Sequence, residues 1–90
     1  MKLVPRRSTF AQDMTPEERA IMMQHIAYWK TYLDEGKLLV YGPVMDPAAT
    51  YGMGILLTED EEEVKMLIAG DPAGQINNYE YYPMRAVMRG

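Results

Sequence analysis

Residues 15–36, TPEERAIMMQHIAYWKTYLDEG, decide the fold of this 90-residue chain. Thr15 suits the N-cap of a helix, Pro16 suits the first helical position, and Glu18 follows the cap at the spacing of a capping box. Gly36 suits the left-handed conformation that ends many helices. The stretch therefore predicts a helix that begins after Thr15, ends at Gly36 and is about 30 Å long at 1.5 Å per residue.

Four strands and a second helix are predicted around this helix from apolar and aromatic runs bounded by Gly and Pro. The strands are expected at Lys2–Val4, Leu38–Tyr41, Tyr51–Thr58 and Tyr79–Met88, and the second helix from an Asp60 cap to about Gly70. Pro5 should limit the first strand to an edge or an end. The order strand, helix, strand, strand, helix, strand predicts a ferredoxin-like split βαβ fold of the α+β class, with two helices on one face of the sheet.

Composition excludes several classes of function. The chain is short enough to form one domain over residues 1–90. Its formal charge is −4 and its Lys and Arg residues are scattered, so it has no basic patch of the kind that nucleic-acid binding requires. No apolar run approaches the roughly 18 residues of a membrane span, and no signal peptide begins the sequence, so we expect a cytoplasmic protein. Without cysteine and with one histidine, we expect no metal.

Two of the predicted strands carry apolar side chains on both faces, at Leu38–Val40 and Ile55–Leu57. Two helices cover only one face of such a sheet, so something else must cover the other. Most soluble oligomers are symmetric assemblies of one chain. We therefore expect a homodimer in which two sheets face each other.

The only histidine lies on the long helix. A helical wheel places Met22, Ile26, Trp29 and Leu33 in one apolar stripe, with His25 at its flank between apolar surface and solvent. A general base with a pKa near neutrality suits such a position. A partly buried histidine that only satisfies a backbone carbonyl is the more usual occupant of such a position, and the spacing does not decide between the two.

Four further residues are candidates for binding a substrate. The connection over residues 6–14 is long enough to lie across the mouth of a site, and it carries Arg6 and Phe10. An arginine in such a loop can hold a carboxylate or a phenolate, although most exposed arginines are only solvated. Trp29 neighbours His25 on the helix, and Tyr41 either packs between strands or lines a pocket for a flat ligand.

Several motifs occur together in a specific order over nearly the whole chain. They are Arg7-Ser8-Thr9-Phe10, Asp13 to Glu18, Met22-x-x-His25-x-x-Tyr28-Trp29, Gly36-Lys37, Gly42-Pro43-Val44, Asp46-Pro47 and Asp71-Pro72. In this order and spacing the chain resembles the YCII-related (YciI-like) family, small dimeric proteins of the α+β-barrel group. The resemblance implies an active-site pair of a helical histidine and an aspartate in a later Asp-Pro step. These correspond to His25 and Asp71, although Asp46 is a second aspartate before a proline and either can simply cap a turn.

The resemblance also implies a type of reaction. We expect a small, cofactor-independent enzyme that performs lyase-like elimination or isomerase-like acid–base chemistry on a small aromatic or enolisable molecule. Asp71 would accept a hydrogen bond from one ring nitrogen of His25, and the other nitrogen would remove or return a proton. The alternative is a non-catalytic module of the same shape that binds a small ligand or a partner protein.

Overall fold

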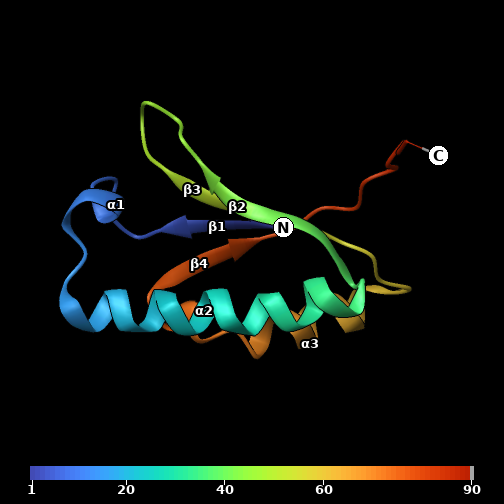
Figure 1. The fold of residues 1–90 in the computed structure, drawn as a ribbon. Coiled ribbons are helices and arrows are strands. Elements are labelled where there is room, and N and C mark those ends of the chain that lie inside the picture. The colour runs from blue at the N-terminus through green and yellow to red at the C-terminus, as the bar shows by residue number, and fades with distance from the viewer. Residues whose placement is uncertain (90) are drawn as a thin grey trace.

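A computed structural model describes residues 1–89 of the chain. Its elements are β1 (Lys2–Pro5), α1 (Phe10–Asp13), α2 (Pro16–Glu35), β2 (Leu38–Val44), β3 (Tyr51–Leu56), α3 (Glu61–Ala69), the 3₁₀ helix η1 (Pro72–Gln75) and β4 (Asn77–Glu80). The strands form one antiparallel sheet in the order β2-β3-β1-β4, and Figure 1 shows α2 and α3 on the same side of it. The predicted α+β class and ferredoxin-like arrangement are confirmed.

The ends of α2 form as predicted. The Thr15 hydroxyl accepts a hydrogen bond from the Glu18 N–H at 3.1 Å, and the Glu18 carboxylate accepts one from the Thr15 N–H at 2.9 Å. Gly36 adopts a left-handed φ of 83° and donates its N–H to the Leu33 carbonyl.

Residues 1–89 contain no helix with both the length and the apolar character needed to cross a bilayer.

The predicted rotation of α2 is wrong. Ile26 and Leu33 were expected in the core stripe, but 48% and 36% of their surfaces are exposed. Trp29 is fully buried, as expected. Tyr28 is half-buried against the same core and His25 is mostly buried, so the inward face of α2 runs through the histidine instead of passing beside it.

The reason for this rotation is the contact between α2 and α3. The Tyr28 hydroxyl donates to the carbonyl of Leu67 at 2.5 Å, and Tyr28 and Tyr32 pack edge-on against each other around the core of Trp29, Leu38 and Leu67. Tyrosine can bury its ring when its hydroxyl finds a partner. A helical wheel that ranks residues by hydropathy predicts isoleucine and leucine on the inward face of α2. In the structure, tyrosines occupy that face instead.

The last strand is shorter and earlier than predicted. A strand was expected over Tyr79–Met88, but β4 covers Asn77–Glu80 and residues 81–89 have no regular structure. Because β4 lies at the sheet edge and pairs only with β1, its ladder stops where Lys2 of β1 faces Glu80. Pro83 then follows, which has no N–H to extend a ladder.

The other strand limits differ less. Pro5 is the last residue of β1, which confirms an end position, although β1 lies between β3 and β4. The strand expected to close at Tyr41 continues as β2 to Val44 through Pro43, because β2 is an edge strand where a missing N–H costs no ladder bond. The strand expected to reach Thr58 ends as β3 at Leu56.

Two glycines of β3 face α2. Gly52 lies opposite Leu3, and Gly54 lies opposite Tyr41. A methyl group on Gly54 would lie 2.7 Å from the Met1 side chain and 3.3 Å from the carbonyl of Val40. A methyl group on Gly52 would likewise lie 3.2 Å from the side chain of Leu3, so both positions need glycine because Met1 and Leu3 already occupy the space beside them.

Candidate functional site

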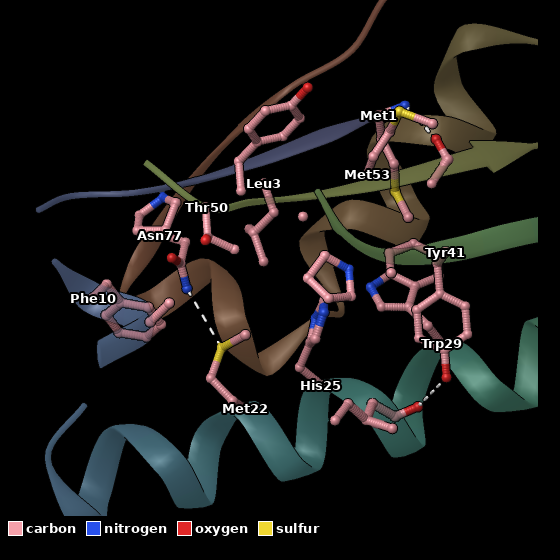
Figure 2. Close-up of a pocket in the computed structure, with 18 of the residues that line it drawn as sticks. Met1, Leu3, Phe10, Met22, His25, Trp29, Tyr41, Thr50, Met53 and Asn77 are labelled. Carbon is pink, nitrogen blue, oxygen red and sulfur yellow. Dashed lines mark hydrogen bonds between the residues drawn. The ribbon is translucent and has the colours of Figure 1, made fainter. Parts of the chain in front are cut away.

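A cavity of about 270 Å³ lies between the sheet and α2. Four of the residues expected at a site line it, namely Phe10, His25, Trp29 and Tyr41. Figure 2 shows Phe10 at one end, His25 in the middle and Trp29 with Tyr41 at the other end. Of the residues that line it within positions 1–89, none is Asp, Glu, Lys or Arg. The cavity therefore suits a small molecule with little charge.

His25 and Asp71 form a hydrogen-bonded pair at this cavity. The ring nitrogen Nδ1 lies 2.7 Å from the Asp71 oxygen Oδ2. Asp71 follows α3 and has no exposed side-chain surface, whereas 13% of the His25 side chain is exposed. The other ring nitrogen, Nε2, has no hydrogen-bond partner among the described residues and is not sealed from the surface. The ring can therefore meet a ligand through Nε2 while Nδ1 is held.

The Asp71 carboxylate is held by four donors in all. Besides His25, the Trp29 indole donates to Oδ2 at 2.8 Å, the Tyr79 hydroxyl donates to the same oxygen, and the Ala73 N–H donates to Oδ1 at 2.9 Å. Burial alone would raise the pKa of Asp71, but these hydrogen bonds outweigh it and hold the pKa below its usual value. Asp71 is therefore ionised at neutral pH and only accepts hydrogen bonds.

This charge state fixes the direction of the central hydrogen bond. A carboxylate has no proton to give, so the His25 Nδ1 must carry the proton and donate it to Asp71. The neutral ring then has a bare Nε2 with a free electron pair on the open side. This is the tautomer that a general base needs.

The other predicted residues lie elsewhere. Arg6 lines a second, more polar depression beside η1 and β4, so the structure does not bring it to the cavity with His25. Asp46 accepts a hydrogen bond from the Ala48 N–H at 2.9 Å, which caps its own loop. Of the two aspartates before prolines, Asp71 is the one that meets His25.

The segment before α2 closes one end of the cavity. It was expected as a connection across the mouth of a site, and it contains the short helix α1, from which Phe10 and Ala11 line the cavity. Arg7 fixes this segment, because its guanidinium binds the carboxylates of Asp13 and Glu18, each at 2.7 Å. These ion pairs are exposed, so their role is to orient α1 more than to stabilise the fold.

Sequence analysis missed two site residues on β4. Tyr79 was expected only as the first residue of the last strand, but its hydroxyl contacts Asp71. Asn77 is buried at the cavity, where its side-chain nitrogen donates to the carbonyl of Ala73 at 3.1 Å. Asn77 was missed because β4 begins two residues earlier than predicted. Once the start of β4 is known, the sequence does show that Asn77 and Tyr79 share one face of the strand, because one residue lies between them.

Metal ligands do not gather at this site: among residues 1–89, no three side chains of His, Asp or Glu lie close enough together to hold an ion.

Comparison with curated proteins and with solved structures returned no significant match. The family model of the YCII-related domain, however, matches residues 4–87, which include every element described above except the first two residues of β1. This match covers nearly the whole chain, and the chain therefore belongs to the YCII-related family.

Proposed function

We propose that this protein is a cofactor-independent acid–base catalyst in which His25 exchanges a proton with a small aromatic or enolisable molecule. The observation that carries the proposal is the 2.7 Å hydrogen bond between His25 Nδ1 and Asp71 at the wall of an apolar cavity. A histidine oriented by a buried carboxylate, with its second nitrogen accessible, is the usual arrangement of a general base.

The reaction begins when Nε2 of His25 takes a proton from an acidic C–H or O–H bond of the substrate. The electron pair of that bond stays on the substrate as an enolate or phenolate, and Asp71 stabilises the imidazolium that forms. Return of the proton to another atom gives an isomer. If the electron pair instead forms a double bond and expels a leaving group, the result is an elimination.

The dimensions of the cavity limit the substrate. A cavity of 150 Å³ can hold one benzene ring, and drug-sized ligands occupy about 300 Å³ or more. The 270 Å³ found here suits one ring with a few small substituents. The aromatic walls formed by Phe10, Trp29 and Tyr41 favour a flat molecule.

A two-step experiment tests this proposal. A panel of small ketones and phenols, including cyclohexanone, acetophenone and hydroquinone, is screened for compounds that raise the melting temperature. Binding compounds are then incubated with the protein in D2O, and exchange at carbon is followed by NMR. We expect the wild type to accelerate exchange and His25→Ala to lose about 10²–10⁴-fold of that acceleration. Gln24→Ala, an exposed neighbour on α2, is the matched control.

Two results would count against the proposal. Compounds that bind but exchange equally fast with wild type and His25→Ala would indicate a non-catalytic binding module. A panel without any binder would show that the cavity does not accept flat, weakly charged molecules.

We also propose that the protein is a homodimer that packs through the sheet face turned away from α2. The register places Val40 and Met53 on that face, together with Ile55, and Val40 and Met53 are 50% and 44% exposed. A second copy of the same sheet is the simplest cover for an apolar face of this kind.

A further inference from the structure

We propose that Tyr79 is a positioning residue that sets how tightly His25 holds a proton, because its hydroxyl shares the Asp71 oxygen to which the ring is bound. This inference rests on the proposed acid–base function of His25. Its basis is the convergence of three donors, from His25, Trp29 and Tyr79, on the single oxygen Oδ2.

The hydrogen-bond directions in this group follow from chemistry. The indole N–H of Trp29 can only donate, and it lies 2.8 Å from Asp71 Oδ2 and 3.1 Å from the Tyr79 hydroxyl oxygen. The Tyr79 oxygen therefore accepts from the indole, and its own proton points to Asp71. Burial, followed by the hydrogen bond to Asp71, raises the pKa of Tyr79 far above its usual value. The hydroxyl thus stays a donor at every pH at which the protein works.

The two neutral donors, Trp29 and Tyr79, weaken the attraction between the Asp71 carboxylate and the protonated His25 ring. An unshared buried carboxylate would hold an adjacent imidazolium strongly and keep the ring protonated. Here the indole and the phenol already stabilise part of the negative charge on Oδ2, so less of it attracts the ring. Asp71 consequently fixes the orientation of His25 and attracts the imidazolium form less than an unshared carboxylate would.

No other charged side chain competes for this role. The side chains that line the cavity around His25 are uncharged apart from the ring itself, and the titratable ones are Tyr41 on β2, Tyr51 on β3 and Tyr79 on β4. Met1 also lines the cavity, and its N-terminal ammonium group donates to the carbonyl of Gly54 at 2.8 Å instead of to Asp71. Tyr41 donates its hydroxyl to the carbonyl of Ile26 at 3.2 Å, away from Asp71. Tyr51 lies under the ammonium group of Lys2. Of these three tyrosines, Tyr79 is therefore the one whose removal takes a hydrogen-bond donor away from the Asp71 carboxylate.

The test compares Tyr79→Phe with Tyr28→Phe by NMR. Both variants remove one partly buried hydroxyl from the core, but the Tyr28 hydroxyl binds the carbonyl of Leu67 and does not touch Asp71. Since the chain has one histidine and one tryptophan, the ring and indole signals need no assignment. We expect the titration of the His25 ring to move to higher pH by about one unit in Tyr79→Phe and to stay unchanged in Tyr28→Phe.

A second measurement needs no variant. In the wild type, the indole N–H signal of Trp29 should shift with the same midpoint as the His25 ring, because both groups bind one oxygen. An indole signal that ignores the ring titration would overturn the proposal, as would an unchanged ring titration in Tyr79→Phe.

A further variant separates this inference from the proposed function. If Asp71→Asn alters the ring titration and Tyr79→Phe does not, the pair of His25 and Asp71 stands and only the role of Tyr79 is wrong. If Asp71→Asn also leaves the ring unchanged, the pair itself is absent in solution, and the proposed function fails with it.

Discussion

The Trp29 indole nitrogen lies 2.8 Å from the Asp71 oxygen that also accepts the His25 ring. The largest fully buried side chain of the protein is therefore bonded directly to the candidate catalytic pair. Packing of the core and geometry of the site are coupled, because any change that moves the indole also removes a donor from the carboxylate.

Replacement of Trp29 tests the packing part of this coupling. Trp29→Ala should lower the free energy of unfolding by about 3–5 kcal/mol, because it leaves a cavity between α2, Leu38 and Leu67. Met23→Ala on the exposed side of the same helix should cost far less. Denaturant midpoints measure both changes. Equal losses would mean that α2 is rotated differently from the structure.

The start of α2 depends on one hydroxyl group. Thr15→Ala should cost about 1 kcal/mol of stability, since it leaves the Glu18 N–H without its capping partner. Thr31→Ala, an exposed threonine within the same helix, is the control and should change stability by only a few tenths of that amount. Thermal or denaturant unfolding distinguishes the two. A loss in Thr31→Ala as large as in Thr15→Ala would contradict the assignment of the cap.

Stability should depend on pH through Asp71. Because the pKa of Asp71 is lower in the folded state, its ionised form stabilises the fold above the unfolded value of about 3.9, and this contribution is lost as the pH falls through the folded pKa. The difference in unfolding free energy between wild type and Asp71→Asn should therefore shrink below about pH 4. Asp46→Asn, which changes an exposed loop aspartate, is the control. A difference that grows toward acidic pH would reverse the sign of this argument.

The proposed homodimer is tested by placing a charged residue on the sheet face that is turned away from α2. Val40→Lys should convert the dimer into a monomer at micromolar concentration, because a symmetric interface would bury two new charges. Met23→Lys places the same charge on an exposed apolar residue of α2 and should leave the dimer intact. Analytical ultracentrifugation gives both masses. A monomeric wild type would end the proposal.

How much the sequence predicts differs between local and long-range features. The limits of α2 are encoded within a few residues of each end, by Thr15 with Glu18 and by Gly36, and they were predicted correctly. The rotation of α2 was not, because it depends on how the Tyr28 ring packs against Leu67 of α3, which lies 39 residues further along the chain.

The site shows the same distinction. The resemblance to a known family singled out His25 and Asp71, whereas spacing alone did not decide whether either residue is functional or structural. Tyr79 was missed because its approach to Asp71 depends on η1, which turns the chain back so that β4 pairs with β1. The length of β4 is likewise set by its partner strand, and not by the aromatic residues near its predicted start.

The most direct test of the central claim is the tautomer of His25 in the wild-type protein. Long-range ¹H–¹⁵N correlation spectra show two ring nitrogens, because the chain has a single histidine. In the neutral ring we predict a protonated Nδ1, bonded to Asp71, and a bare Nε2 that faces the cavity. A neutral ring protonated at Nε2 would show that His25 is not held by Asp71 and has no free electron pair for a substrate proton.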